Sequence, residues 1–456
     1  MALDAESEAI GSLLLDRGAL TAEQLDAAED LAEDWNVSLV KVLLSRRWLT
    51  TQTLYREIAF YHGLTLVDLI EDRADDDLIR QYDPVVMNQF MTVPIGRAED
   101  GTLTVATSRP GPRTLLHIRE VYGTGVTIVV ASHFDVSWQL QRAFREKHSH
   151  EAVFALAELD PDMSAQNVVT PPQILVIYLL VSALLLGLAF SPVVTLIVLN
   201  VFLTVFYTGN FLFKALLVWL GGAAQETSSR AIAAEASLLR DEDLPIYTVL
   251  VPMFREPEVL PILAQALRNL DYPLAKLDIK IVLEEGDHET IDAARKLDLE
   301  GVFEIIRVPA SHPQTKPKAC NFALRYAQGD FLVIFDAEDK PEPDQLKKVI
   351  AAFNQSAPNT ACIQCRLNYY NARENWLTRM FTLDYSLWFD LMLPGLERLG
   401  VPIPLGGTSN HFRMDVLREL NAWDPFNVTE DADLGIRLTQ KGYRVGVIDS
   451  TTFEQA

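Results

Sequence analysis

The chain has 456 residues, which is too long for one compact core and long enough for two or three domains. It carries 62 acidic residues against 39 basic ones, so its formal net charge is -23 at pH 7. A surface this negative repels nucleic acid, and nucleic acid is excluded as a partner on that ground. Three cysteines are too few for a disulfide framework and indicate a reducing, cytoplasmic setting.

The N-terminal region begins with one pattern repeated twice: an apolar helix, a turn that ends in Leu-Thr, and a second helix. The copies read IGSLLLDRGALTAEQLDAAEDLAED and VSLVKVLLSRRWLTTQTLYREIAFYHGL. Thr21 and Thr50 are the predicted N-caps of the two second helices, and Gln24 completes a capping box with Thr21. From about residue 64 to 144, three short β-type runs alternate with helical patterns, which predicts a small α/β lobe.

Residues 1–150 together resemble the N-terminal domain of type II secretion and type IV pilus assembly ATPases. In some members of that family the paired helical repeats bind cyclic di-GMP. The nucleotide-binding versions have an Arg before the repeat glycine, whereas Ala9 precedes Ile10-Gly11 here. This departure favours a protein-docking or structural role, and sensing of cyclic di-GMP is the alternative. No G-x-x-x-x-G-K-[ST] sequence occurs, so the ATPase motor is absent.

An apolar stretch follows a predicted linker at 151–172, in which we expect one short helix. Residues 173–220 contain a single formal charge, Lys214, and are long enough for two spans of about 20 residues, separated at Ser191-Pro192. A buried hairpin in a soluble protein is the alternative, but such helices normally keep a polar face. We therefore expect a transmembrane hairpin in the inner (plasma) membrane. No signal peptide is recognisable, and both flanking regions should be cytoplasmic.

From Asp243 onward, apolar strand patterns alternate with helix patterns. This alternation predicts an α/β fold with a mostly parallel sheet, which binds ligands at the carboxyl ends of its strands. Two clusters of acidic residues directly follow such strands. One cluster is often no more than a solvated loop, but two at strand ends favour a bound cation, Mg²⁺ or Mn²⁺, that carries a diphosphate. The clusters are Glu284, Glu285 and Asp287, and Asp336, Glu338 and Asp339.

Residues 244–456 are identified as resembling family 2 glycosyltransferases, particularly the membrane synthases of cellulose and other β-glucans. The resemblance is carried by LVPMFREP, KPKACNFAL, FDAED, GGTSNHFR and TEDADLGIRL, in that order. It implies the GT-A nucleotide-diphospho-sugar transferase fold for residues 243–456. It also implies inverting transfer of a hexose from a UDP-sugar to a growing β-linked polysaccharide, the carbohydrate acceptor.

The resemblance assigns roles on the donor side. It places Pro252 and Glu256 around uracil and ribose, and Glu285 at the first acidic contact of the nucleotide. Lys318 is expected to neutralise the diphosphate, with Asn321 one helical turn further along.

The pair Asp336 and Glu338 matches the D-x-D motif of the family. Asp336 is expected to face the nucleotide sugar, and Glu338 together with Asp336 to bind the metal. Asp339 is the alternative second metal ligand, and Lys316 is the alternative phosphate partner.

On the acceptor side the resemblance assigns the general base to Asp431, beside Glu430. An acceptor hydroxyl must lose its proton as it attacks, so a carboxylate is required there. A plain helix N-terminus capped by Thr429 is the structural alternative, and both can hold at once. Gly407 and Thr408 are expected beside the acceptor sugar. His411 is a less favoured base.

Two further patterns have structural interpretations. The aromatic run 376–393 is predicted to be a helix packed in the core, with an interfacial helix under the membrane as the alternative. Cys362 and Cys365 form a C-x-x-C in a strand-like run, and packing is favoured over zinc because no second pair is nearby.

The sequence ends at TTFEQA, before the Q-x-x-R-W motif and the further spans of processive family members. We therefore expect the transferase domain to be truncated. A second functional hypothesis is a degenerate, non-catalytic receptor or scaffold whose N-terminal domain docks a protein or senses cyclic di-GMP. The Glu residues at 285 and 338 favour this alternative slightly.

Overall fold

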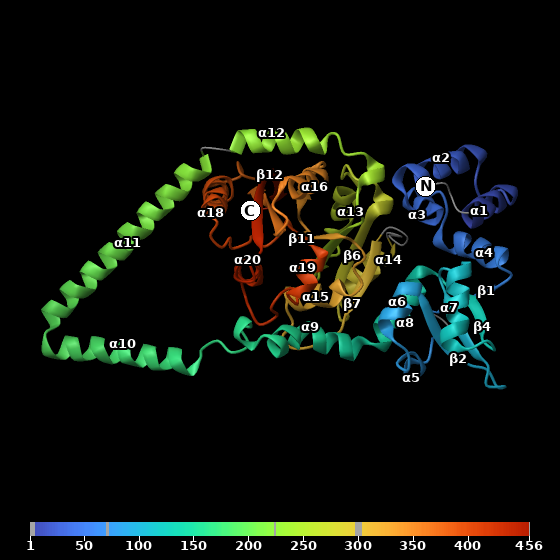
Figure 1. Cartoon of the computed structure of the whole chain (residues 1–456), viewed down its shortest axis with the longest axis horizontal. Coiled ribbons are helices and arrows are strands. Elements are labelled where there is room, and N and C mark those ends of the chain that lie inside the picture. The colour runs from blue at the N-terminus through green and yellow to red at the C-terminus, as the bar shows by residue number, and fades with distance from the viewer. Residues whose placement is uncertain (1–4, 70–72, 223–224, 297–302, 456) are drawn as a thin grey trace. The chain divides into compact units, whose positions relative to one another are not determined.

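The structure is a computed structural model that describes residues 5–69, 73–222, 225–296 and 303–455. It divides into two compact units. Figure 1 labels the helices and strands in chain order. The first contains residues 1–153 and 238–338, and the second contains residues 154–237 and 339–456.

The first unit begins with four helices, α1 (Ala5–Asp16), α2 (Ala22–Trp35), α3 (Leu39–Ser45) and α4 (Thr51–Tyr61). The predicted capping box is present at α2, because Thr21 Oγ1 accepts from Gln24 N at 3.2 Å and Gln24 Oε1 accepts from Thr21 N at 3.0 Å. Thr50 caps α4 by accepting a hydrogen bond from Thr53 N at 3.2 Å, without a capping box. Leu14, Leu43 and Leu54 are fully buried between these helices, so both predicted helix pairs form.

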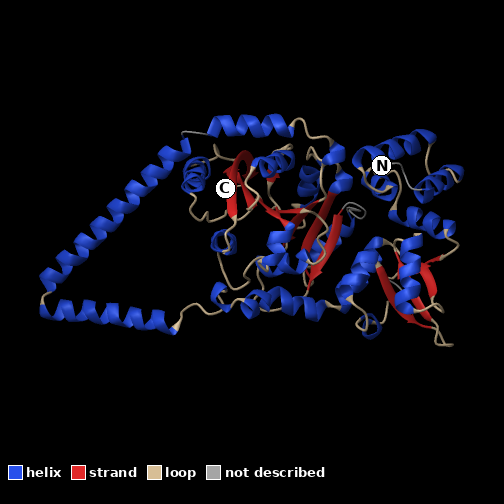
Figure 2. Cartoon of the chain, viewed as in Figure 1, coloured by secondary structure: helices blue, strands red, loops and turns tan. Residues whose placement is uncertain are grey.

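A four-stranded sheet follows, with the strand order β1-β4-β3-β2. Strand β4 is parallel to both of its neighbours, and β2 and β3 are antiparallel. The predicted α/β lobe is therefore present (Figure 2). Its elements are β1 (Thr65–Leu66), α5 (Asp76–Ile79), α6 (Pro84–Phe90), β2 (Thr92–Arg97), β3 (Leu103–Thr107), α7 (Pro112–Tyr122), β4 (Thr127–Val130) and α8 (His133–Ala143).

The rest of the first unit is built on four parallel strands in the order β7-β6-β5-β8. These strands are almost wholly buried, as expected where helices cover both faces of a parallel sheet. The elements are η2 (Asp241–Asp243), β5 (Tyr247–Met253), α13 (Leu260–Arg268), η3 (Leu274–Lys276), β6 (Leu277–Glu284), α14 (His288–Lys296), β7 (Phe303–Val308), α15 (Lys316–Leu324) and β8 (Phe331–Ile334). The predicted alternation of strands and helices is confirmed.

Helix α9 (Arg145–Leu159) extends well into the segment predicted as a linker with one short helix. It is followed by a single 3₁₀ turn, η1 (Pro161–Met163), so the non-helical part of the linker is shorter than expected. Its apolar residues are too widely spread to reveal a 15-residue helix in the sequence.

The apolar stretch forms two helices, α10 (Pro171–Phe190) and α11 (Pro192–Gly222), with only Ser191 between them. Both are long and apolar enough to cross a membrane, and neither is buried within the described protein. Close to the turn the helices pack tightly, since a Cβ on Gly187 would lie 2.7 Å from Thr195 Oγ1. Figure 1 shows them diverging from this turn. Helix α12 (Gln225–Ala236) follows.

The second unit also contains a mixed sheet in the order β11-β10-β12-β9. Strands β10 and β12 are parallel, and the two outer pairs are antiparallel. Its elements are β9 (Lys340–Pro341), α16 (Gln345–Gln355), β10 (Thr360–Tyr369), α17 (Trp376–Tyr385), the π-helix η4 (Ser386–Met392), α18 (Leu393–Leu399), β11 (Asn410–Arg413), α19 (Met414–Glu419), α20 (Glu430–Gln440) and β12 (Arg444–Glu454).

The aromatic run is only half buried. Phe389 and Leu393 lie in the core, but Trp376 and Leu383 on α17 are 74% and 64% exposed. The core-packing interpretation is therefore wrong for α17 and right for η4 and α18. Cys362 and Cys365 are free and fully buried in β10, where they pack as small apolar side chains.

Candidate functional site

A cavity of about 580 Å³ opens in the first unit at the carboxyl ends of β5, β6 and β8. This is the edge at which parallel sheets bind ligands. Four of the residues predicted to bind donor or metal line it: Pro252 at the end of β5, Glu256 in the following loop, and Asp336 and Glu338 after β8. The structure therefore brings these four predicted residues together around one cavity.

The positive charge of this cavity comes from Lys316, at the start of α15. Its Nζ lies 2.5 Å from Asp336 Oδ1, and both side chains remain partly exposed to the cavity. Lys316 was the sequence-based alternative to Lys318 as phosphate partner, and it is the lysine that the structure places there.

Lys318 itself lies elsewhere. It is fully buried, 2.9 Å from Glu284 Oε1, and its amine also donates to the carbonyl oxygen of Pro309 at 3.1 Å. An amine so enclosed is a structural cation, and the expectation that it binds diphosphate is corrected. Asn321 is also turned away from the cavity, because its side-chain amide donates to the carbonyl oxygen of Ala152 at 3.0 Å.

The acidic residue of β6 that lines the cavity is Glu284 and not the predicted Glu285. Glu284 is the last residue of β6, whereas Glu285 lies in the turn that follows the strand. Glu285 is half exposed and lies 3.6 Å from Arg145 Nη1. Glu284 therefore lines the cavity in the place where Glu285 was expected.

Negative charge is concentrated around the cavity. The pKa of Glu256 is raised by partial burial and then by the charges of Glu338 and Asp336. Such mutual repulsion favours a bound cation. The third acid of the first cluster, Asp287, is used structurally: it accepts from Arg255 N at 2.6 Å and caps α14 through Thr290 N at 3.2 Å.

These carboxylates fit a divalent ion only in part. Among the described residues no group of three His, Cys, Asp or Glu side chains is arranged to hold a metal. Asp336 and Glu338 nevertheless line the same cavity. One or two protein carboxylates, completed by substrate phosphates and water, are the usual ligands of Mg²⁺. The donor set therefore suits an ion that is shared with a diphosphate.

Asp339, the alternative metal ligand, lies in the second unit and is buried. Its carboxylate accepts a hydrogen bond from the hydroxyl of Thr408. Thr408 is also buried and therefore holds its loop in place, contrary to the expectation that it contacts the acceptor. A Cβ on the neighbouring Gly407 would meet no atom within 4 Å, so this position remains open.

The predicted base Asp431 occupies the first turn of α20, directly after Glu430. It is 5% exposed, and its carboxylate accepts from Trp423 Nε1 at 3.1 Å. The indole is itself buried, so it fixes the orientation of this carboxylate. Thr429 precedes the helix but makes no side-chain capping bond, which removes the simplest structural explanation of the motif.

His411, the less favoured base, is fully buried in β11, and burial lowers its pKa to about 3. An imidazole with so low a pKa and no access to solvent is poorly suited to take a proton from an acceptor sugar. The structure thus leaves Asp431 as the better candidate of the two.

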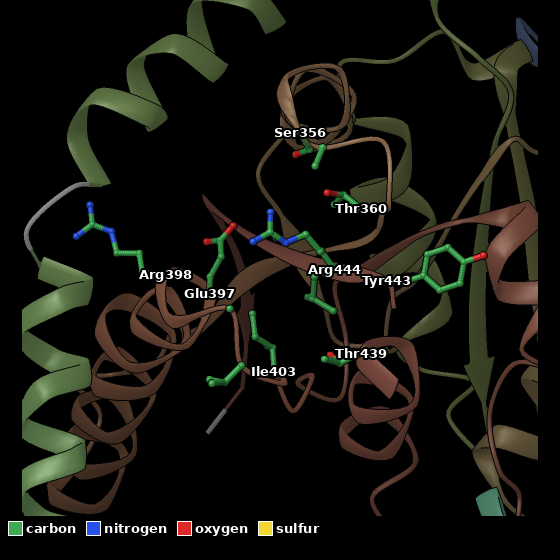
Figure 3. A pocket seen from close by; sticks show the side chains of 13 residues that line it. Ser356, Thr360, Glu397, Arg398, Ile403, Thr439, Tyr443 and Arg444 are labelled. Carbon is green, nitrogen blue, oxygen red and sulfur yellow. The ribbon is translucent and has the colours of Figure 1, made fainter. Parts of the chain in front are cut away.

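The second unit contains a separate pocket of about 350 Å³ where α16, α18 and α20 end and β12 begins (Figure 3). In Figure 3 the Glu397 carboxylate is directed toward the Arg444 guanidinium, and Arg398 points away from them. Burial raises the pKa of Glu397 to about 7, although a backbone hydrogen bond from Val447 and the two arginines oppose this shift. No predicted donor, metal or acceptor residue is among the described residues that line this pocket.

Comparison with known proteins gives a family match for two regions of the chain. Residues 245–453 match the family model described as Glycosyltransferase like family 2. Residues 62–150 match the MshEN domain.

The curated relatives include a beta-monoglucosyldiacylglycerol synthase of Trichormus variabilis, 28% identical over 43% of this chain and 41% of the relative. They also include a glucomannan 4-beta-mannosyltransferase of Arabidopsis thaliana, 26% identical over 45% of this chain and 40% of the relative. The chain thus spans about two fifths of the length of these relatives.

Solved structures give weaker matches. A mannosyltransferase from Pyrobaculum calidifontis in complex with GDP-Man and Mn²⁺ is 22% identical, with a TM-score of 0.36 over 52% of this chain and 68% of its own. A structure of MshE with cdg is 24% identical, with a TM-score of 0.27 over 29% of this chain and 97% of its own.

The chain therefore carries a family 2 glycosyltransferase domain and an MshEN domain. Both resemblances predicted from the sequence are confirmed, and so is the GT-A-like α/β fold of the transferase region.

Proposed function

We propose that this chain is a membrane-bound inverting glycosyltransferase that transfers a hexose from a UDP-sugar to a growing β-linked polysaccharide. The observation that carries the proposal is the cavity at the carboxyl ends of β5, β6 and β8, where Glu284, Lys316, Asp336 and Glu338 face one space. A nucleoside diphosphate needs cations beside its phosphates and polar groups beside its sugars, and this cavity offers both. The names of the curated relatives support transfer of a β-linked sugar.

In the proposed reaction the acceptor hydroxyl transfers its proton to the Asp431 carboxylate as its oxygen attacks the anomeric carbon of the donor. The new bond from oxygen to carbon forms as the bond to the diphosphate breaks, and that electron pair leaves with the diphosphate. Lys316 stabilises the charge that develops there. A divalent ion held by Asp336 and Glu338 would add Lewis-acid stabilisation of the same charge. Trp423 orients Asp431 through the indole hydrogen bond.

We also propose that α10 and α11 span the inner membrane and leave both soluble regions in the cytoplasm, where nucleotide sugars are made. Their lengths of 20 and 31 residues and their exposure support this placement. Trp219 and Lys214, near the end of α11, are side-chain types suited to a membrane interface.

For the N-terminal domain we propose protein docking within the same chain, and binding of cyclic di-GMP is the alternative. Docking is supported by the contacts of α8 with strand β7 and of α9 with helix α15 of the transferase region. Titration of the whole chain with cyclic di-GMP distinguishes the two roles, because binding at micromolar ligand contradicts a purely structural domain.

The experiment that tests the proposed function uses membranes that contain the whole chain, supplied in turn with UDP-glucose, UDP-N-acetylglucosamine and GDP-mannose. We expect release of UDP from a UDP-hexose, dependent on Mg²⁺ or Mn²⁺ and lost in Asp431→Asn. Calorimetry with UDP and Mn²⁺ gives a second readout. A chain that binds no UDP and turns over none of the three donors fits the degenerate, non-catalytic alternative and contradicts the proposal.

A further inference from the structure

Helix α9 begins where the N-terminal domain ends and lies against α15 and the loops on either side of it. Asn321 of α15 donates to the backbone oxygen of Ala152 at 3.0 Å. Glu151 forms an ion pair with Arg325, one residue beyond the end of α15. These two contacts hold the C-terminal half of α15 to α9, the helix that continues from the N-terminal domain.

The neighbouring turn of α9 makes two more contacts on the same side. His148 Nδ1 and the hydroxyl of Tyr326 are 2.9 Å apart, and Ser149 donates to Ser311 at 3.0 Å. Both His148 and Tyr326 are buried. Burial lowers the pKa of His148 to about 4, so the ring is neutral at pH 7 and this contact is a hydrogen bond and not an ion pair.

The opposite side of α15 forms a wall of the donor cavity. Lys316 and Ala319 line the cavity, and Lys316 pairs with Asp336. Lys318 fixes the same helix to β6 through Glu284. A shift of α15 therefore moves the cation of the cavity relative to its carboxylates.

The N-terminal domain is also anchored to the neighbouring strands by a buried charge network. Lys280 of β6 is fully buried, 2.8 Å from Asp278 Oδ1 and paired with Glu304 of β7. Burial alone lowers the pKa of Lys280, but the two carboxylates outweigh it and raise the pKa above its usual value.

Helix α8 completes this network. Its Ser137 donates a hydrogen bond to Glu304, and Gln141 donates to Ser137 at 3.2 Å. A buried carboxylate that lost such a partner would be costly to keep charged. The N-terminal domain is therefore fixed to the strands while α9 reaches α15.

We propose that α9 positions α15, so that the N-terminal domain sets how tightly the donor cavity holds a nucleoside diphosphate. The inference rests on the proposed donor site. In this inference Glu151 and Asn321 are positioning residues, because they act on the donor cavity only through the placement of α15 and its Lys316. If these contacts only packed the domains together, their loss would lower the stability of the chain and leave its donor affinity unchanged.

The test reverses one charge of the contact and then restores the pair. In Glu151→Arg, two cations face each other beside α15. Because both side chains of this pair are about one third exposed, the expected effect is modest. We expect the affinity for UDP with Mn²⁺ to fall about threefold, with a matching rise in the KM of the donor and an unchanged kcat. Glu151→Arg combined with Arg325→Glu should return the affinity to within about twofold of the original chain.

The matched control is Glu146→Arg, which makes the same charge change on an exposed position of α9. Calorimetry of the whole chain in detergent gives the UDP affinity, and hydrogen exchange of residues 316–324 reports directly on α15. Faster exchange and weaker binding in Glu151→Arg alone, both restored in the double variant, support the inference.

Two results contradict it. If Glu151→Arg binds UDP as tightly as Glu146→Arg does, α9 does not set donor affinity and the inference alone is wrong. If the unsubstituted chain binds no UDP with Mn²⁺, the proposed donor site is wrong and the inference falls with it.

Discussion

The amine of Lys316 lies 2.5 Å from a carboxylate oxygen of Asp336. This ion pair joins the start of α15 to the segment after β8, and both residues line the cavity. A partly exposed pair of this kind adds little stability. Its position inside the proposed donor site therefore points to a role in ligand binding.

Substitution of this lysine should weaken donor binding selectively. In Lys316→Met the diphosphate loses a charge-assisted hydrogen bond, and we expect the affinity for UDP to fall about tenfold. Lys147→Met, an exposed lysine on α9, is the control and should bind UDP normally. Calorimetry measures both variants. Equal affinities would show that the diphosphate does not contact Lys316.

The buried pair of Lys318 and Glu284 should respond differently, through stability. Lys318→Met leaves Glu284 without its cation in a nearly closed environment, and we expect the free energy of unfolding to fall by about 3 kcal/mol. Combining Lys318→Met with Glu284→Leu removes the orphaned charge and should recover most of that loss. Denaturant unfolding of the detergent-solubilised chain measures the effect. If the double variant is less stable than Lys318→Met, burial of a lone carboxylate is not the cause.

Lys316 and Lys318 show which features of the structure could be predicted from the sequence. The order of strands and helices and the acids at strand ends could be predicted, because apolar periodicity and motif spacing are local properties. The direction in which an individual side chain points could not be predicted in this way. Lys316 and Lys318 are two positions apart on a helix and so differ in direction by about 200°. The start of the helix and its packing against β6 decide which of them reaches the cavity.

The same limit explains why the sequence could not tell which acid near the end of β6 lines the cavity. Glu284 and Glu285 are both plausible in the sequence, but β6 ends at Glu284, which lines the cavity, and Glu285 lies in the following turn. The sequence contains no sign of which, because the choice depends on the register of β6 against β5 and β7. The contact of Asn321 could not be predicted for a related reason. Its partner is a backbone oxygen of α9, 169 residues away in the chain.

The pocket of Glu397 predicts a pH dependence of stability. The folded pKa of this carboxyl is about 7, above the ordinary value of 4.5. Between these two pH values the unfolded chain releases a proton that the folded chain retains, so stability falls as the pH rises from about 4.5 to about 7. Glu397→Gln should flatten the dependence of the melting temperature on pH in this window. An identical pH profile for Glu397→Gln and the original chain would assign the slope to other groups.

The proposed topology predicts the accessibility of two introduced cysteines. Ser191 lies in the turn between α10 and α11, and Asp100 lies in an exposed turn of the N-terminal domain. The native cysteines Cys320, Cys362 and Cys365 are all buried, so they give little background. In intact cells a membrane-impermeant maleimide should label Ser191→Cys and should reach Asp100→Cys only after permeabilisation. Labelling of both in intact cells contradicts a cytoplasmic N-terminal domain.

The sharpest test of the chemistry separates donor binding from proton transfer. Removal of a general base lowers the rate of the chemical step and leaves donor binding intact, so Asp431→Asn should lower kcat by about 10²–10⁴-fold with unchanged UDP affinity. Asp415→Asn, an exposed acid of α19, is the control and should keep its activity. A full rate in Asp431→Asn shows that this carboxylate takes no proton.

Trp423 extends this test to the orientation of the base. Trp423→Phe removes the indole donor that lies 3.1 Å from Asp431 and keeps an aromatic ring in the core. A freer carboxylate spends less time in the productive orientation, so kcat should fall, by less than in Asp431→Asn, while the affinity for UDP stays constant. The cavity left by the smaller ring also lowers stability, so kcat is measured well below the melting temperature of the variant. An unchanged kcat under these conditions shows that the indole serves packing alone.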